Sequence, residues 1–514
     1  MIRHLFLTGL VLCSLSETSQ AALTLSALFS DSMVLQRDQP VKVWGWASPD
    51  ASVTVAIGDQ KHTVRAEASG RWMATLEPMS AGGPHTLTVS DGRSTTTVSD
   101  VLIGDVWLCS GQSNMAMTVS RSRDAEAEQA AAKFPQIRMF RESSGPAAEP
   151  QEKCSGSWSV CSPETVGSFS ATAYFFGRRL HQELGVPIGL INSSVGGTSI
   201  ESWTSLDAQQ QVPELEPRLA AWNSDDKNFD EAKATSAYEK NLERWKTSVA
   251  EAKEAGKPAP RKPSPPVRPR SDRNFPANLF NGKIAPLVGY TIKGAIWYQG
   301  ENSAGRGFSH LYGTQLKTLI SDWRARWGQG DFPFGWVQLP NFRNAQVQPV
   351  EDSGWVLVQE GMLKTLKEPH TGMAVTIDVG EAGDIHPKDK QTVGHRMAQW
   401  ALSSVYGKDI LPMGPIFSKA DFRNDGSVQI QFQYAAGLHA VDGKVLGFAV
   451  AGKDQKFVAA DAVIEGESVV VRSSEVSQPA SVRYAWAANP VISLYSSAQI
   501  PASPFRTDDW KVSQ

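Results

Sequence analysis

The chain has 514 residues, of which 41% are hydrophobic and 20% are charged, and its formal net charge at pH 7 is −3. This length exceeds what one hydrophobic core usually serves, so we expect a globular protein of two or three domains. The small net charge provides no basic surface for nucleic acid and no polybasic patch for a membrane, so we expect neither as a partner.

Residues 1–21 have the features of a secretory signal peptide. Arg3 provides a charged start, residues 5–15 form a short apolar core, and Ser19 and Ala21 are the small residues that a signal peptidase needs. We expect cleavage after Ala21 and a secreted or periplasmic mature protein without a membrane-inserted segment, because the apolar run is too short to span a bilayer. A lipid anchor on Cys13 is the weaker alternative, since bulky residues precede this cysteine.

Three cysteines follow the signal segment. Cys154 and Cys161 flank a short Ser/Gly segment, and in an oxidising compartment we expect them to form a small disulfide loop. Two free thiols are the alternative. Cys109 lies in an apolar run and is expected in the core. Three scattered cysteines do not indicate a metal site.

The pattern of residues 22–100 is that of β-structure. Segments 41–46 and 52–57 alternate or run apolar, and turn residues separate them. Several short strands at this spacing predict a small β-sandwich-like module.

From residue 101 to about 410, strand-like runs alternate with helical stretches, which is typical of an α/β domain. We expect strands over 101–108, 188–192, 294–298 and 374–377. Residues 205–273 interrupt this rhythm with a charged helix over 238–255 and a proline-rich stretch, so we interpret them as an insertion. Residues 411–514 return to β-structure and form a second β module.

Ser113 lies in the turn Gly-Gln-Ser-Asn after the first of these strands. A serine hydroxyl becomes an effective nucleophile when a neighbouring base takes its proton, and a tight turn holds it exposed. The tetrapeptide alone also fits a polar turn in which the serine caps a helix. The assignment therefore depends on the other motifs.

His386 is the best candidate among nine histidines for the base. Asp384 is close enough in sequence to accept the Nδ1–H of the imidazole and fix its tautomer. A surface histidine in an Asp/Pro loop is the alternative. A metal site built with Asp378 and Glu381 is a further alternative. It leaves the other motifs unexplained, so we expect no metal.

Two further motifs provide donors for an oxyanion. Gly196 and Gly197 permit close approach of a backbone N–H to a substrate carbonyl. Gln299 follows another strand, and its side-chain amide is expected to donate to the same oxygen, with Glu301 holding the loop. The alternative for this last motif is a buried strand end whose polar groups satisfy each other.

These motifs belong to longer strings, namely residues 29–37, 109–115, 196–198, 297–301, 384–390 and 501–510. In these strings the chain resembles the sialate O-acetylesterase family of the SGNH (GDSL-like) hydrolase superfamily, and the similarity covers nearly the whole mature sequence. The resemblance implies an α/β fold with an SGNH (flavodoxin-like) three-layer α/β/α domain flanked by N- and C-terminal β-rich modules. It also implies that no metal or organic cofactor is needed.

For the site, the resemblance implies Ser113 as nucleophile and His386 as base. The residues that it places in the oxyanion hole are Ser113, Gly196 or Gly197, and Gln299. The wider superfamily usually spaces its acid and base as Asp-x-x-His, whereas this chain has Asp-x-His with glycine at position 383. The orienting group is therefore Asp384, Asp378 or a backbone carbonyl, and we favour Asp384.

Together these observations predict a carbohydrate O-acetylesterase of the 9-O-acetyl sialic acid type that forms an acyl-enzyme on Ser113. One alternative is an acetyl xylan or other plant-polysaccharide O-acetylesterase with the same mechanism. Another is a non-catalytic carbohydrate-binding protein on a hydrolase scaffold. The residues expected to support the site or contact substrate are Asn114, Glu301, Trp297 and Trp203. Trp158, Trp203 and Trp297 are placed either to stack on sugar faces or to fill the core.

Overall fold

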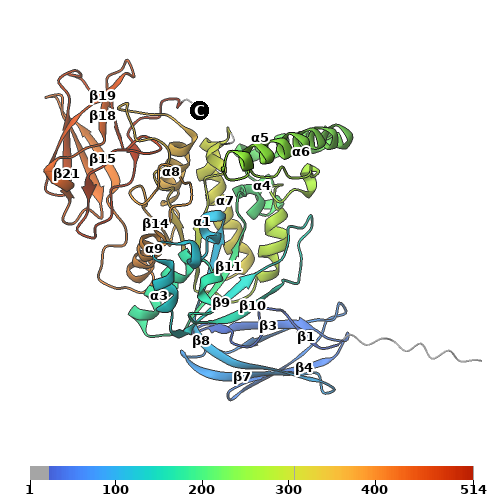
Figure 1. The fold of residues 1–514 in the computed structure, drawn as a ribbon. Helices are drawn as coiled ribbons and strands as arrows, with labels where there is room; N and C mark the ends of the chain where they lie inside the picture. Colours follow the sequence, from blue (N-terminus) through green and yellow to red (C-terminus); the bar gives the residue numbers. More distant parts are fainter. Residues whose placement is uncertain (1–21, 306, 513–514) are drawn as a thin grey trace, which may run out of the picture.

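A computed structural model describes residues 22–305 and 307–512. The expected signal segment 1–21 lies outside this range. Three parts follow one another along the chain: an N-terminal β module, a central α/β part and a C-terminal β module (Figure 1). Figure 1 shows the central part between the two β modules, with the N-terminal module in blue and the C-terminal module in red.

The central part is built on the largest sheet, which has 11 strands and whose main path follows the order β10-β9-β11-β8-β12-β13-β14. The strands of this path are β8 (Thr95–Gly111), β9 (Phe134–Glu142), β10 (Gly156–Cys161), β11 (Ile188–Ser194), β12 (Gly294–Tyr298), β13 (Phe334–Val337) and β14 (Thr371–Ala374). Neighbours from β9 to β14 are parallel, and β10 at the edge is antiparallel to β9. Strand β14 ends at the residue where the sequence pattern predicts its start.

Helices cover both faces of this sheet. Helices α3 (Ala171–Leu184) and α9 (Lys390–Ser404) pack against each other on one face, and α7 (Tyr312–Trp327) and α8 (Gly354–Thr365) pack on the other. Alternating strand residues supply the two cores. Trp107 and Cys109 belong to the cluster with α3 and α9, whereas Leu108 belongs to the cluster with α7 and α8. Parallel strands are buried on both faces, which explains their nearly continuous apolar sequences.

The N-terminal module consists of short, mostly antiparallel strands packed around buried residues such as Val43, Trp72 and Val89, and β2 is parallel to β8. Its strands are β1 (Thr24–Leu25), β2 (Val34–Gln36), β3 (Val41–Trp46), β4 (Ser52–Ile57), β5 (Gln60–Arg65), β6 (Arg71–Leu76) and β7 (Gly82–Ser90). The first half of β8 pairs with β7 and β2, and its second half enters the central sheet. This 17-residue strand therefore runs through the expected boundary between residues 100 and 101.

The C-terminal module contains two four-stranded sheets and one two-stranded sheet. The first sheet comprises β15 (Ile416–Phe422), β16 (Val428–Gln433), β20 (Asp461–Glu465) and β21 (Ser468–Arg472). The second comprises β18 (Phe448–Ala451), β19 (Phe457–Ala459), β22 (Ser481–Tyr484) and β24 (Phe505–Arg506). The two-stranded sheet pairs β17 (His439–Ala440) with β23 (Leu494–Tyr495).

The expected insertion forms helices that project from the central part, shown in green in Figure 1. They are α4 (Leu206–Gln210), α5 (Glu216–Lys227) and α6 (Glu231–Glu254). Helix α6 contains the predicted helix over 238–255 except its last residue, and it has no buried residue. Residues 257–268 then run without a helix or strand. Among the described helices, none combines the length and apolarity that a membrane crossing requires.

The predicted disulfide between Cys154 and Cys161 is wrong, since both thiols are free in the described chain. The intervening residues form strand β10 and not a loop, and each strand residue advances the chain by about 3.3 Å. The Sγ atom of Cys154 lies 3.9 Å from the Oγ of Ser26, whereas that of Cys161 lies 4.0 Å from the carbonyl oxygen of Ala132. The two cysteines therefore contact different parts of the fold. Cys109 is buried, as predicted.

Candidate active site

Three of the four sequence motifs follow neighbouring parallel strands of the central sheet. Ser113 follows β8, Gly196 follows β11, and Gln299 follows β12. The register pairs Gly111 at the end of β8 with Ser194 on one side and with Tyr298 on the other. Because the carboxyl ends of parallel strands share one edge, these residues meet where α/β sheets place their ligands.

A sharp turn presents Ser113 at this edge. Gly111 has a φ of +140°, and a Cβ atom at this position would lie 2.1 Å from the carbonyl oxygen of Tyr298, so only glycine fits. The backbone N–H of Gln112 donates to the same carbonyl at 2.9 Å. Ser113 then begins the short helix α1 (Ser113–Ala116) and remains partly exposed. The turn therefore holds the serine at the surface of the sheet edge.

The glycine turn after β11 packs directly against this serine. A Cβ atom on Gly196 would lie 3.3 Å from the Cβ of Ser113, and Gly197 has a left-handed φ of +71°. Within residues 22–305 and 307–512, the backbone N–H groups of Ser113, Gly196 and Gly197 donate to no protein acceptor. Free N–H groups beside a nucleophile are what an oxyanion hole requires.

Gln299 is held by protein groups in the described structure. Its side chain is fully buried, and its Nε2 donates to the carbonyl of Thr198 at 3.0 Å and to the Oε1 of Gln112 at 3.3 Å. Its Oε1 accepts from the hydroxyl of Tyr312 at 2.9 Å. The amide is engaged with these protein acceptors in the unliganded structure, and its donation to a substrate oxygen stays a prediction. Through these bonds Gln299 joins the Ser113 turn to the glycine turn.

The loop after β14 carries His386 and its carboxylate. The Nδ1 of His386 lies 3.5 Å from the Oδ1 of Asp384, and the same oxygen accepts the backbone N–H of His386 at 2.9 Å. Asp378, the other candidate, forms two bonds to Arg396 at 2.6 and 2.8 Å. Asp384 is therefore the carboxylate that faces the ring. The described residues contain no group of three or more His, Cys, Asp or Glu arranged to hold a metal.

The electrostatic surroundings of His386 favour its neutral form. Partial burial lowers the pKa of His386, the nearby charges of Lys390 and Arg121 lower it further, and Asp384 acts in the opposite direction. A neutral imidazole near pH 7 is the form that can accept a proton from a serine. Ser113 and His386 share no hydrogen bond in the described structure. In unliganded enzymes such bonds are often long and tighten when substrate binds.

Asn114, the residue after the nucleophile, connects the motifs through a buried polar network. Its Nδ2 donates to a carboxylate oxygen of Glu301 and, at 3.0 Å, to the carbonyl of Ile385. Its Oδ1 accepts from the Nζ of Lys390 at 2.7 Å, and this Nζ also donates to the carbonyl of Pro387 at 2.6 Å. Asn114 and Glu301 are expected to support the site or contact substrate, and in this network both contact protein groups.

Lys390 is the member of this network that sequence reasoning missed as a functional residue. Its side chain is fully buried, and burial lowers the pKa of Lys390 to about 7 against the opposing effect of Glu301. Burial also raises the pKa of Glu301. A lysine at the start of a helix is usually exposed, and nothing in the local sequence marks Lys390 as buried, because its partners Asn114 and Glu301 are distant in the chain.

The tryptophans near the motifs belong to the core. Trp203 and Trp297 are fully buried, and Trp158 is 7% exposed. Their indole N–H groups donate to the Oγ1 of Thr198, the hydroxyl of Tyr312 and the carbonyl of Leu28, respectively. The expectation that these rings stack on a sugar is therefore wrong, and the core alternative holds.

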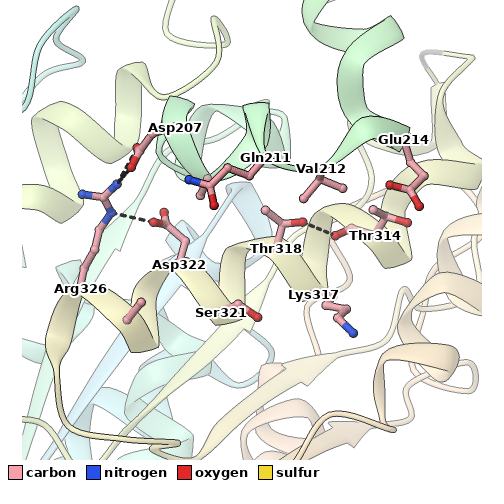
Figure 2. A pocket seen from close by; sticks show the side chains of 12 residues that line it. Asp207, Gln211, Val212, Glu214, Thr314, Lys317, Thr318, Ser321, Asp322 and Arg326 are labelled. Atoms are coloured by element: carbon pink, nitrogen blue, oxygen red, sulfur yellow. Dashed lines mark hydrogen bonds and ion pairs between the residues drawn. The ribbon is translucent and has the colours of Figure 1, made fainter.

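A cavity of about 780 Å³ lies away from these motifs, between α4 with the following turn and α7 (Figure 2). Figure 2 shows Arg326 between Asp207 and Asp322, and its guanidinium lies 2.6 Å from each carboxylate. No histidine is among the residues that line this cavity. A smaller cavity of about 210 Å³ adjoins α1 and is lined by residues that include Ala116, Arg141, Asn192 and Ser194.

Comparisons with known proteins show the family to which this chain belongs. The family model "SASA: Carbohydrate esterase, sialic acid-specific acetylesterase" matches residues 103–255 and 279–403. The sialate O-acetylesterase of Mus musculus is 30% identical over 97% of this chain and 97% of its own length. That of Homo sapiens is 29% identical over 93% of this chain and 91% of its own. The crystal structure of a carbohydrate acetylesterase from Xanthomonas citri is 36% identical, with a TM-score of 0.79, and covers 95% of this chain and 100% of that one.

Proposed function

Because the chain belongs to the carbohydrate esterase family of sialic acid-specific acetylesterases, we propose that it hydrolyses acetyl esters on sugars with Ser113 as its nucleophile. One observation carries this proposal. Ser113, with free N–H donors around it, is linked through Asn114 to the loop in which Asp384 faces His386. Nucleophile, oxyanion donors, base and orienting carboxylate are the parts that a serine esterase needs.

In the first half of the reaction, His386 takes the proton of the Ser113 hydroxyl as its Oγ attacks the acetyl carbonyl. The backbone N–H groups of Ser113 and of Gly196 or Gly197 donate to the negative oxygen that develops. The protonated imidazole then gives its proton to the departing sugar oxygen, which leaves as a free hydroxyl. The product is an acetyl ester on Ser113.

In the second half, His386 takes a proton from water, and the resulting attack on the acetyl-serine releases acetate and restores the hydroxyl. Asp384 keeps the Nδ1 of His386 protonated, so that its Nε2 is the atom that accepts and returns the proton. Asn114 and Lys390 do not touch the reacting atoms in this scheme. They hold the His386 loop against the Ser113 turn.

The sheet order supports an SGNH-type scaffold for this chemistry. Five of the seven strands on the main path, β11-β8-β12-β13-β14, have the order 2-1-3-4-5 when these five are numbered along the chain, which is the order of flavodoxin-like sheets, and β9 and β10 extend the sheet beyond β11. Helices on both faces of the sheet also support the three-layer α/β/α domain that the resemblance implies. We also propose export of the mature chain to the periplasm or beyond, on the pattern of residues 1–21.

For the substrate, we propose an O-acetylated sialic acid, with the ester on the 9-hydroxyl. The names of the family model and of the mouse and human relatives support an acidic nine-carbon sugar over a neutral polysaccharide.

Acetate release tests the proposal when wild type, Ser113→Ala and the control Ser120→Ala are compared on 4-nitrophenyl acetate, 9-O-acetylated N-acetylneuraminic acid and acetylated xylan. We expect Ser113→Ala to lose at least about 1,000-fold in kcat, as removal of a triad nucleophile does, and Ser120→Ala to match wild type. Faster release from xylan than from the sialic acid would assign the polysaccharide alternative. If wild type hydrolysed none of these esters, the result would favour the alternative of a non-catalytic carbohydrate-binding protein.

A further inference from the structure

The insertion of residues 205–273 returns to the catalytic edge of the sheet at its last residue. Asn274, which follows it, is buried and accepts the backbone N–H of Ser199 at 2.9 Å through its Oδ1. The Oγ of Ser199 donates to the carbonyl of Asn274 at 3.3 Å. Ser199 lies two residues after Gly197, so the end of the insertion is fastened to the glycine turn of the site.

The arginines at this end of the insertion differ in their partners. Arg268 and Arg270 both pair with the buried carboxylate of Asp226 on α5, at 3.1 and 3.3 Å. Asp226 also accepts the backbone N–H of Arg270 at 3.0 Å. These contacts fix the returning chain. Arg273 is exposed, and within the described residues no carboxylate or carbonyl accepts from its guanidinium.

The free guanidinium lies over the glycine turn. The Nη2 of Arg273 is 3.6 Å from the position that a Cβ atom would take on Gly197, and the corresponding position on Gly196 is 3.3 Å from the Cβ of Ser113. Since neighbouring Cα atoms are 3.80 Å apart, these contacts place the guanidinium at most about 15 Å from the Ser113 hydroxyl. A nine-carbon sugar with its ester at one end and its carboxylate at the other has a length of the same order.

We propose that Arg273 binds the carboxylate of the sugar whose acetyl ester lies at Ser113, and that the insertion serves to deliver this arginine. Its planar fork matches a carboxylate with two parallel hydrogen bonds, and it has no internal partner to give up. This inference deepens the proposed function and rests on it. It makes Arg273 the residue that separates acidic sugars from neutral ones such as xylose.

Arg121 is a competing cation. It is exposed at the end of the short helix that follows α1, on the side of the His386 loop, where the backbone N–H of Arg123 donates to the carbonyl of Lys388 at 2.8 Å. Arg273 is favoured because it lies over the turn whose N–H groups face the acetyl carbonyl. The test therefore includes both arginines.

Binding of N-acetylneuraminic acid and of its methyl ester, measured by calorimetric titration, isolates the carboxylate contact without requiring turnover. The full mature chain is compared with Arg273→Gln, Arg121→Gln and the control Arg261→Gln in the proline-rich stretch. We expect wild type and Arg261→Gln to bind the free acid about tenfold more tightly than the ester, as the loss of a charged hydrogen-bonded pair predicts. We expect this preference to vanish in Arg273→Gln.

The affinity for the free acid is compared with the affinity for the ester within each protein, so a general loss of affinity cancels. Thermal melting checks that each variant is folded. Equal binding of acid and ester by wild type, or an unchanged preference in Arg273→Gln, would overturn the proposal. Loss of the preference in Arg121→Gln alone would also overturn it. Because this binding measurement does not require cleavage of an acetyl ester, an inactive Ser113 site would leave this result intact, and the two proposals fail separately.

Discussion

The amide of Asn114 donates to the carbonyl of Ile385 at 3.0 Å, and this bond joins the residue after the nucleophile to the residue before the base. The two residues are 271 positions apart in the chain. The distance between Ser113 and His386 is therefore controlled by a side chain that touches neither the acetyl group nor the imidazole. Asn114 is a positioning residue in this account.

Asn114→Ala is expected to lower kcat by about 100-fold, because misplacing a catalytic group by about 1 Å costs that much. It also leaves the buried Lys390 and Glu301 without their shared partner, so the free energy of unfolding should fall by about 1–3 kcal/mol. Steady-state kinetics on 4-nitrophenyl acetate and urea unfolding measure the two effects. A variant with wild-type kcat would show that the loop position does not depend on this bond.

Because Lys390 is buried, we expect the free energy of unfolding to increase as the pH rises above about 7. Its pKa is lowered by burial to about 7 in the folded state, below its value in the unfolded chain. Between these two values the unfolded state binds more protons, so stability rises with pH above 7, by up to about 1.4 kcal/mol per pH unit. Lys390→Met removes this contribution.

The measurement is urea unfolding of wild type and Lys390→Met at pH 7, 8 and 9. We expect the difference in unfolding free energy to change in favour of wild type as the pH rises. Parallel curves at all three pH values would contradict a buried lysine with a lowered pKa.

The acid limb of the pH–rate profile should report His386. Its pKa is lowered mainly by burial, with a contribution from Arg121, so the limb is expected below the ordinary histidine value of about 6.5. Arg121→Gln removes a positive charge near the imidazole, and the limb should move to higher pH. Profiles of kcat/KM for wild type, Arg121→Gln and Arg261→Gln test this. A shift of the acid limb to lower pH in Arg121→Gln would contradict the expected effect of this charge.

Asp384→Asn should lower kcat by about 100-fold or more while the fold is retained, because the carboxylate no longer fixes the tautomer of His386. Its loss also removes a charge that raises the pKa of His386, so the remaining activity should have its acid limb at lower pH. Glu381→Gln, on the same loop, is the comparison. Equal losses in the two variants would indicate a damaged loop and not a specific orienting carboxylate.

The sequence predicts well what depends on local pattern. Strand-like runs precede Ser113 and Gly196, so the sequence predicts both motifs at the carboxyl edge of a sheet. This prediction is possible because the chain order of the strands and the glycines of the turns can be read directly from the sequence. The pairing of Asp384 with His386 was also accessible, because two residues of separation limit where the carboxylate can lie.

What the sequence did not predict depends on which atoms meet in three dimensions. Gln299 follows a strand in the way that an oxyanion donor would, and only its contact with Thr198 shows that its amide is occupied. Cys154 and Cys161 are close in sequence, but a strand between them separates their thiols. Lysine is almost never fully buried unless it is paired, and here the oxygen atoms of Asn114 and Pro387 hold Lys390 inside the fold.

The central claim is that an acetyl group passes through Ser113, and acid quenching followed by mass spectrometry tests it most directly. Wild type, His386→Ala and Ser113→Ala are mixed with excess 4-nitrophenyl acetate, stopped within the first turnover and digested. We predict one acetyl group on the peptide that contains Ser113 in wild type and none on that peptide in Ser113→Ala. Active wild-type enzyme with no acetylated Ser113 at any quench time, or an Ser113→Ala variant with wild-type turnover, would contradict the account.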